Sequence, residues 1–315
     1  MLHATLADQS WVDDLGPIEG VRTSVWDLRG PAPRTPIDVV VAPYQGAAEV
    51  IGAVGQVPSV RLVQLLTAGY DGILEQVPDR VAVANAAGVH DASTAELALA
   101  LVLAAQRGLP GFVRAQDQGV WGPRPFLPSL ADRRVLVVGY GQVGRAIARR
   151  LMPFEARLTA VASRARAGDD LVDAVHGIDE LLKLLPDTEI AIVVTPLSPD
   201  TEGLIGEGFL AALPDDALVV NVARGPVADT AAILRHTGRL RFALDVTDPE
   251  PLPEGHPLWH AEGVLITPHV GGVSTAFRPR ALALLREQLT RLAAGDEPDH
   301  VVGQGSASSA KPAWG

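Results

Sequence analysis

Residues 135–144 read Val-Leu-Val-Val-Gly-Tyr-Gly-Gln-Val-Gly, and a helical pattern follows from Arg145 to Met152. Four apolar residues predict a buried strand, and G-x-G-x-x-G between a strand and a helix predicts a dinucleotide-binding turn. The first glycine permits the tight bend, the second lets a pyrophosphate approach the backbone, and the third lets the helix pack on the strand. The N–H groups at the helix N-terminus then face the phosphates. The expected cofactor contacts are Gly139, Tyr140, Gly141, Gln142, Val143 and Gly144, with a purely structural junction as the alternative.

The chain around this turn alternates short apolar runs with helical patterns. Apolar runs lie at 134–138, 157–162, 189–195, 217–222, 240–246 and 264–267, and helical patterns lie at 142–152, 178–185, 206–213 and 229–236. Continuously apolar strands separated by helices are typical of a parallel sheet covered on both faces. Further apolar runs at 37–42, 60–66 and 81–84 precede the turn. We therefore predict the α/β class with two doubly wound, Rossmann-like domains and an active site in the cleft between them.

The mid-chain position of the turn indicates how the domains divide. We expect residues 1–96 to form a substrate-binding domain, completed by a C-terminal helix at 281–302, and residues 97–280 to form the dinucleotide-binding domain. Residues 303–315 include Ser306-Ala-Ser-Ser309 and are expected to form a flexible tail. The stretch 108–129 is rich in Gly and Pro and is expected to be irregular.

A buried helix is predicted just before this irregular stretch. Ser93 and Glu96 have the spacing of a capping box, and Leu97 to Arg107 is almost wholly apolar. A helix that is apolar on all sides has to be buried, so it should lie between domains or between subunits. We therefore expect a homodimer.

Composition excludes several functional classes. The 315 residues include 37 acidic and 26 basic ones, and the net charge of −11 disfavours nucleic-acid and anionic-membrane binding. Because there is no cysteine, disulfides, thiolate nucleophiles and cysteine-ligated metals are excluded. His256 and His260 have a zinc-compatible spacing, but Pro257 and the lack of a nearby third ligand argue against a metal site. No signal peptide is recognisable, and the longest apolar run, Leu97 to Ala105, is too short for a bilayer, so we expect a cytoplasmic protein.

The end of the strand at 157–162 bears on the choice of cofactor. An NAD site normally offers Asp or Glu there for the ribose hydroxyls. Here the sequence is Val161-Ala-Ser-Arg-Ala-Arg166, and the first carboxylate is Asp169. The hydroxyl of Ser163 and the guanidinium groups of Arg164 and Arg166 suit a phosphate dianion instead. NADP is therefore favoured over NAD, with merely solvated arginines as the alternative.

Three polar motifs follow strands in the second half of the chain. They are Asn221-Val-Ala-Arg224-Gly225, Asp245-Val-Thr-Asp-Pro-Glu250-Pro251 and Thr267-Pro-His269-Val-Gly271. Ligands bind outside the carboxyl ends of parallel strands, so all three should face the dinucleotide. Singly, Arg224 could form a surface ion pair, Glu250 could be a loop residue and His269 a capping residue. Together they predict a catalytic site.

These motifs resemble those of the D-isomer-specific 2-hydroxyacid dehydrogenases, and in particular those of glyoxylate/hydroxypyruvate reductase-type members. The resemblance covers nearly the whole chain and includes Ala68-Gly-Tyr-Asp71 and Asp299-His-Val-Val302. It implies that Arg224 binds and polarises a 2-oxo acid, that His269 is the general acid/base and that Glu250 pairs with it. The other implied contacts are Asp245 on the nicotinamide side, Thr195, Pro196 and Gly271 with the cofactor, and backbone groups of Ala68, Gly69 and Tyr70 with the substrate carboxylate.

The chemistry of the three side chains agrees with this resemblance. The guanidinium fork of Arg224 matches a carboxylate beside a carbonyl, and it stabilises the alkoxide that hydride transfer generates. A protonated His269, oriented by Glu250, supplies the proton. We expect reduction of a small 2-oxo acid, such as glyoxylate, hydroxypyruvate or a phenylpyruvate-like acid, to the D-2-hydroxy acid. The alternatives are a formate- or phosphite-type dehydrogenase and a nucleotide-sensing interaction protein without catalysis. Formate oxidation needs no proton transfer, so Glu250 beside His269 would have no evident task in it.

Overall fold

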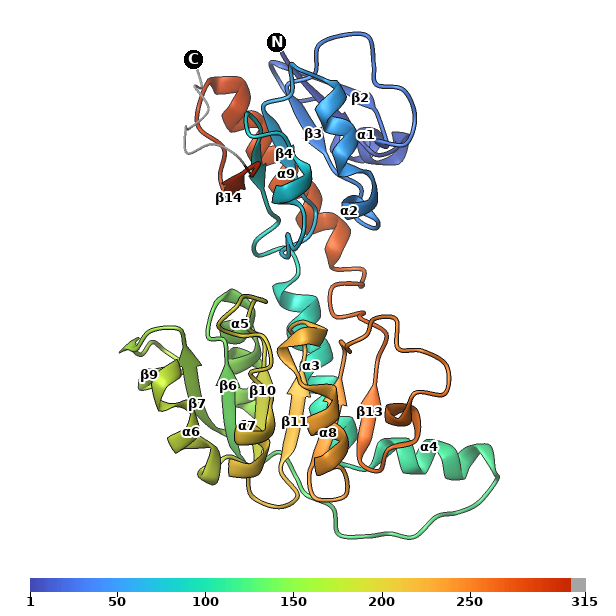
Figure 1. Ribbon diagram of the computed structural model, residues 1–315, viewed down its shortest axis with the longest axis vertical. Helices are drawn as coiled ribbons and strands as arrows, with labels where there is room; N and C mark the ends of the chain where they lie inside the picture. The colour runs from blue at the N-terminus through green and yellow to red at the C-terminus, as the bar shows by residue number, and fades with distance from the viewer. Residues whose placement is uncertain (307–315) are drawn as a thin grey trace. The chain divides into compact units, whose positions relative to one another are not determined.

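The computed structural model describes residues 1–306 and divides the chain into two compact units. Unit 1 combines Met1–His90 with the chain from Thr275 onward, and unit 2 comprises Asp91–Ser274. The domain boundaries predicted from the sequence lie at 96/97 and 280/281. Each unit contains its own predominantly parallel sheet with helical segments packed on it (Figure 1). The α/β class with Rossmann-like architecture is confirmed.

Unit 1 is built on a six-stranded sheet with the order β14-β5-β4-β3-β1-β2. The strands are β1 (Leu2–Leu6), β2 (Val21–Val25), β3 (Val39–Val41), β4 (Leu62–Gln64), β5 (Ala82–Ala84) and β14 (Val301–Gln304). Helices α1 (Gln9–Leu15) and α9 (Phe277–Ala294) pack on one face, and α2 (Ala47–Val50) with the 3-10 turn Ile51–Gln56 packs on the other. The strand order reverses between β1 and β3, as in doubly wound sheets.

Unit 2 is built on an eight-stranded sheet with the order β13-β12-β11-β10-β6-β7-β9-β8. The strands are β6 (Arg134–Val138), β7 (Arg157–Ala162), β8 (Arg166–Ala167), β9 (Ala174–Gly177), β10 (Ile190–Val193), β11 (Leu218–Asn221), β12 (Arg241–Leu244) and β13 (Val264–Ile266). Helices α3 (Asp91–Gln106) and α5 (Gln142–Leu151) cover one face, and α6 (Leu181–Leu184), α7 (Glu207–Ala212) and α8 (Thr230–His236) cover the other. The order reverses between β6 and β10, which places the glycine-rich turn at the switch point.

Strand β10 shows why these strands are apolar along their whole length. Ile190 and Ile192 belong to the core under α3 and α5, whereas Ala191 and Val193 belong to the core under α7 and α8. Successive side chains of a strand point to opposite faces, so a sheet covered on both faces buries every residue. All four residues are fully buried.

Several expectations about individual elements are wrong. The stretch expected to be irregular contains helix α4 (Leu109–Asp117), and the expected tail begins with two residues of β14, which pairs antiparallel with β5. The rest of that expected tail, from residue 307, lies outside the described residues. Ser93 and Glu96 do not cap α3, because the helix already begins at Asp91.

The apolar helix α3 packs on the sheet of unit 2. Its residues Ala98, Leu101 and Val102 share one core with Ile147 of α5 and Ile192 of β10. Burial within one unit therefore accounts for its composition, and its sequence carries no argument for a homodimer.

Among residues 1–306 no single helix is long and apolar enough to cross a bilayer. Helices α3 and α4 reach that length and apolarity only together, and they are bent by 71° at the break between them.

Candidate active site

The glycine-rich turn joins β6 to α5 under tight packing. A Cβ at Gly139 would lie 2.8 Å from the backbone carbon of Val194, and Gly139 has a φ of +103°. A Cβ at Gly144 would collide with the carbonyl oxygen of Gly139, whereas at Gly141, the N-cap of α5, it would meet nothing within 4 Å. The first and third glycines are thus required by packing, and the second leaves space in front of the helix N-terminus. This arrangement fits a pyrophosphate.

Thr195 lies beside the turn, directly after β10. Its hydroxyl oxygen is buried and has no hydrogen-bond partner in the described part of the chain. A buried hydroxyl without a partner is unfavourable, so this group suits a bound ligand. Thr195 and its neighbour Pro196, both expected cofactor contacts, therefore lie at the switch point with Gly139.

Arg166 is tied to the glycine-rich turn. Its Nη2 donates to the carbonyl oxygen of Tyr140 at 2.5 Å, and its guanidinium lies 6.0 Å from the Tyr140 ring centroid. Ser163 and Arg164 are exposed, and within residues 1–306 their side chains form no hydrogen bond or ion pair. Of the three residues expected at the 2′-phosphate, the structure thus brings Arg166 to the turn and leaves Ser163 and Arg164 in solvent.

Asp169 is already engaged by protein groups. Its carboxylate accepts hydrogen bonds from the Tyr140 hydroxyl at 3.1 Å and from Arg145 Nε at 2.7 Å, and Arg145 also pairs with Asp170. Burial, together with the hydrogen bond to Asp169, raises the pKa of Tyr140 to about 12, so this phenol stays protonated. The first carboxylate after β7 therefore binds protein donors instead of facing a ribose. Sequence reasoning missed this cluster, because only the fold brings Arg145 to Asp169.

The first strand-end motif carries Arg224 after β11. Asn221, fully buried, accepts from the N–H of Ala223 at 3.0 Å and donates to the carbonyl of Arg224 at 3.2 Å. The Arg224 Nη1 donates to the carbonyl of Ala223 at 2.7 Å. At Gly225 a Cβ would collide with the carbonyl of Thr247, so this loop packs tightly on the next one. The sequence placed Asn221 in this motif without a role, and the structure shows that its side chain holds the loop that carries Arg224.

The second and third motifs meet at a histidine–glutamate pair. The Nδ1 atom of His269 lies 2.6 Å from Oε1 of Glu250, and the two side chains are 44% and 41% exposed. An ionised carboxylate has no proton to donate and can only accept a hydrogen bond, so Nδ1 of His269 carries the proton of this hydrogen bond. The other ring nitrogen, Nε2, remains available for proton transfer.

Asp245 organises the loop that carries His269. Its Oδ1 accepts from the Thr267 hydroxyl at 2.6 Å and from the Val270 N–H at 2.9 Å, and its Oδ2 accepts from the Gly271 N–H at 2.8 Å. Asp245 is 3% exposed. The loop that contains Gly271, an expected cofactor contact, is therefore fixed by the buried carboxylate of Asp245.

In unit 1 the loop Ala68-Gly69-Tyr70 follows β4. The carbonyl of Ala68 accepts from Asn85 Nδ2 at 2.7 Å, and that of Gly69 accepts from the Thr67 hydroxyl at 2.7 Å. The N–H groups of Ala68, Gly69 and Tyr70 donate to no acceptor within residues 1–306. A loop with satisfied carbonyls and three open N–H groups suits an anion.

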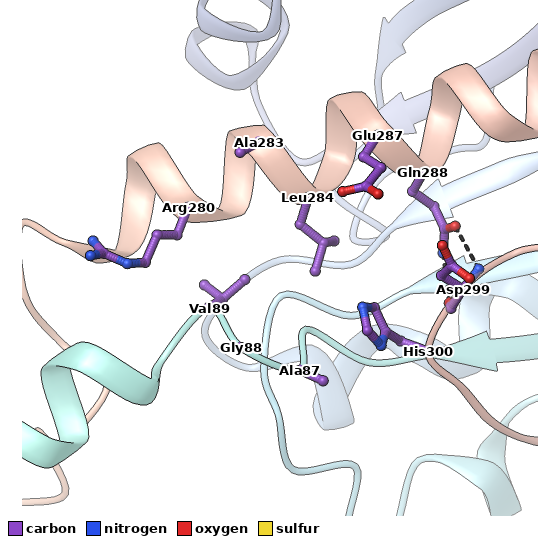
Figure 2. Close-up of a pocket in the computed structure, with 10 residues that line it drawn as sticks. All are labelled: Ala87, Gly88, Val89, Arg280, Ala283, Leu284, Glu287, Gln288, Asp299 and His300. Atoms are coloured by element: carbon purple, nitrogen blue, oxygen red, sulfur yellow. Dashed lines mark hydrogen bonds between the residues drawn. The ribbon is translucent and has the colours of Figure 1, made fainter. Parts of the chain in front are cut away.

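A cavity of about 300 Å³ lies elsewhere in unit 1 (Figure 2). It is lined by Ala87, Gly88, Val89, Arg280, Ala283, Leu284, Glu287, Gln288, Asp299 and His300. None of the expected catalytic residues lines it. The cavity is therefore distinct from the strand-end motifs of unit 2.

A parallel sheet with a dinucleotide turn at its switch point, and a paired imidazole after another strand of the same sheet, is typical of the Rossmann-type oxidoreductases that use a nicotinamide cofactor.

Comparisons with known proteins identify the family. The model of the D-isomer specific 2-hydroxyacid dehydrogenase, NAD binding domain, matches residues 99–271, more than half of the chain. Glyoxylate reductase of Korarchaeum cryptofilum is 32% identical over 257 residues, covering 78% of this chain and 77% of that protein. Glyoxylate reductase/hydroxypyruvate reductase of Mus musculus is 29% identical over 267 residues, covering 79% and 81%. The crystal structure of a D-isomer specific 2-hydroxyacid dehydrogenase from Xanthobacter autotrophicus Py2 in complex with NADPH and MES has a TM-score of 0.81 and 30% identity, covering 96% of this chain and 97% of that one.

The chain belongs to the D-isomer specific 2-hydroxyacid dehydrogenase family. The resemblance seen in the sequence is confirmed, and the protein is an NAD(P)-dependent oxidoreductase that acts on the CH–OH group of 2-hydroxy acids and on small 2-oxo acids.

Proposed function

We propose that this protein reduces glyoxylate, hydroxypyruvate or a similarly small 2-oxo acid to the D-2-hydroxy acid, with Arg224, His269 and Glu250 as its catalytic residues. The observation that carries the proposal is the 2.6 Å contact between His269 Nδ1 and Glu250 Oε1. The names of the relatives from Korarchaeum and mouse support the substrate class.

The bound nicotinamide would supply a hydride to the carbonyl carbon. Arg224 binds the 2-oxo acid through its fork of donors and stabilises the negative charge that develops on the carbonyl oxygen. His269 gives the proton on Nε2 to that oxygen, while its Nδ1–H stays bonded to Glu250 and fixes the ring orientation. The open N–H groups of Ala68, Gly69 and Tyr70 hold the substrate carboxylate.

The cofactor proposed for the turn is NADPH in preference to NADH. Gly141 leaves space before the N-terminus of α5, and Thr195 offers an unpartnered hydroxyl. Arg166 at the turn, with Ser163 and Arg164 beside it, provides cations and a hydroxyl for a 2′-phosphate. Asp169 is bound to Tyr140 and Arg145, which supports the absence of a ribose-binding carboxylate. The Xanthobacter structure was solved with NADPH.

A formate- or phosphite-type activity is the second candidate within the same fold. Formate oxidation releases carbon dioxide without a proton transfer to substrate oxygen, so the His269–Glu250 pair would have no task. Turnover is to be measured with a panel of 2-oxo acids and NADPH, and with formate and phosphite and oxidised cofactor. Activity with a 2-oxo acid supports the proposal, and activity confined to formate or phosphite overturns it.

We also propose that the protein assembles as a homodimer through α4 and the segment after it. The apolar side chains exposed there are Leu109, Phe112, Val113, Val120, Trp121 and Phe126. Trp121 is 85% exposed, and exposed large apolar side chains concentrated in one short segment are typical of an interface. Sedimentation at micromolar concentration tests the assembly, and a monomer would contradict it.

A further inference from the structure

The loop proposed to hold the substrate carboxylate is anchored through its carbonyl groups. Besides the bonds to Ala68 and Gly69, the carbonyl of Thr67 accepts from the Ala86 N–H at 2.8 Å, and the carbonyl of Leu66 accepts from His90 Nε2 at 2.8 Å. Because each carbonyl faces the protein, the N–H groups of the following residues are left for a ligand. The orientation of the loop therefore depends on these donors.

We propose that His90 is a positioning residue that holds the Ala68–Tyr70 loop in its carboxylate-binding conformation. The inference rests on the proposed role of that loop. His90 is the last residue of unit 1 before α3, and its side chain is the donor that reaches the Leu66 carbonyl. A carbonyl oxygen can only accept, so Nε2 carries the proton of this hydrogen bond.

The ring of His90 is fixed by its surroundings. It stacks on Phe277, at a centroid distance of 5.2 Å and an interplanar angle of 10°, and it lies 5.6 Å from the Tyr44 ring. Phe277 and Tyr44 also stack on each other at 4.0 Å. The imidazole is 7% exposed, and its Nδ1 has no partner in the described structure. A phenyl ring would satisfy this stack without an unpaired nitrogen, so packing alone does not explain a histidine here.

A second set of buried groups supports the same strand end from α9. Gln64, at the end of β4, donates to the carbonyl of Leu65 at 2.9 Å and accepts from Gln288 at 2.8 Å. Gln288 in turn accepts from the backbone N–H of Asp299, the contact drawn in Figure 2. These bonds fix the base of the loop, whereas His90 acts on Leu66, nearer to the open N–H groups. Replacing His90 should therefore loosen the loop while β4 stays in place.

Two substitutions separate the hydrogen bond of His90 from its packing. His90→Phe keeps the aromatic stack and removes the donor, whereas His90→Gln keeps a nitrogen donor at a similar reach and removes the stack. We expect His90→Phe to raise KM for the 2-oxo acid roughly 2- to 10-fold, the worth of one hydrogen bond, and to leave KM for NADPH unchanged. His90→Gln should restore KM for the 2-oxo acid toward the parent value. His3→Phe is the matched control, because His3 is also buried in unit 1 but bonds to Pro36 and Ser24.

Hydrogen–deuterium exchange of the Ala86 and Ile73 amides, which donate to the loop carbonyls of Thr67 and Tyr70, provides a readout that does not depend on turnover. His90→Phe should speed exchange of these amides without affecting β4, and His3→Phe should not. Unchanged exchange in His90→Phe overturns the inference, and so does faster exchange with an unchanged KM for the 2-oxo acid. If the parent turns over no 2-oxo acid, the proposed function fails. Binding of oxamate, a carboxylate analogue, is then measured by calorimetry on the same variants with bound NADPH. That measurement still decides whether His90 orders the loop for an anion.

Discussion

The backbone N–H of His269 donates to the backbone carbonyl of Asp245 at 2.7 Å, so the residue after β12 holds the loop after β13. His269 has a φ of +52°, in the left-handed region that residues other than glycine seldom occupy. The carboxylate of Asp245 secures both sides of this conformation through Thr267, Val270 and Gly271. A conformation of this kind persists where its surroundings determine it, and here a buried carboxylate does so.

Asp245→Asn should therefore destabilise the protein and lower kcat. Each carboxylate oxygen of Asp245 now accepts hydrogen bonds from N–H or O–H groups. In the variant the NH₂ group would face one of these donors, and the lost hydrogen bond lowers the free energy of unfolding by about 1–3 kcal/mol. Urea denaturation and initial rates measure the two effects. Asp248→Asn, an exposed position in the neighbouring loop, serves as the control. A variant of Asp245 with parental stability would contradict the assigned role.

His269→Ala should lower turnover far more than it weakens cofactor binding. Proton donation acts in the transition state, and general acid–base groups contribute about 10²–10⁴-fold to rate. Steady-state kcat and NADPH titration by fluorescence separate the two effects. Unchanged turnover would remove His269 from the mechanism.

Glu250→Gln should lower kcat and leave KM for NADPH unchanged. A side-chain amide is a neutral acceptor, whereas the carboxylate at 2.6 Å forms a charge-assisted hydrogen bond, so the His269 ring is oriented less firmly in the variant. Losing about 1 kcal/mol of this hydrogen bond corresponds to a roughly 5-fold lower kcat. Steady-state rates measure the effect, and Glu254→Gln, which removes an exposed carboxylate from the same loop, should leave kcat in place. A parental kcat in Glu250→Gln would argue against the pair.

Arg164→Ala and Arg166→Ala should each raise KM for NADPH and leave KM for NADH nearly unchanged. One charge-assisted hydrogen bond is worth about 1.5–3 kcal/mol, or roughly 10- to 150-fold in affinity. Arg166 should have the larger effect, because its guanidinium is already held at the carbonyl of Tyr140. Arg157→Ala, at the opposite end of β7, is the control. If the parent uses NADPH and NADH equally well and neither substitution changes this, the two arginines are solvated and do not bind the 2′-phosphate.

The raised pKa of Tyr140 leads us to expect a loss of stability at alkaline pH. Its pKa is raised to about 12 by burial and by Asp169, whereas a tyrosine in the unfolded chain titrates near 10. A group with a raised pKa contributes its full stabilisation below the unfolded value and loses it as pH rises through the folded value. The stability difference between the parent and Tyr140→Phe should therefore be constant below pH 10 and decline between about 10 and 12. A difference that does not change with pH would contradict this expectation.

The sequence by itself determined the strand–turn–helix at 134–151 and the apolar strands of unit 2. Those features depend on residues close together in the chain, namely continuous apolar runs and the spacing of Gly139, Gly141 and Gly144. The strand-end positions of Arg224 and His269 followed from the same local patterns, because parallel strands carry their ligands at their carboxyl ends.

Strand β1 shows where such patterns fail. It contains the polar residues His3 and Thr5, both buried, and the ring of His3 bonds to Pro36 and Ser24. No local periodicity signals a strand with a buried histidine whose ring nitrogens find their partners more than twenty residues away. Helix α4 was missed for a related reason, because its Gly- and Pro-rich surroundings mask a short helix with exposed apolar side chains.

Only the tertiary structure decided which side chains position the others. Asp245 supports the loop of His269, Asp169 binds Tyr140 and Arg145, and His90 reaches the Leu66 carbonyl. These partners lie 24 to 29 residues apart in the chain. Hydrogen bonds depend on distances of about 3 Å and on direction, and the packing of strands and loops sets both. Residue order alone contains the donors and acceptors, and the fold selects which of them meet.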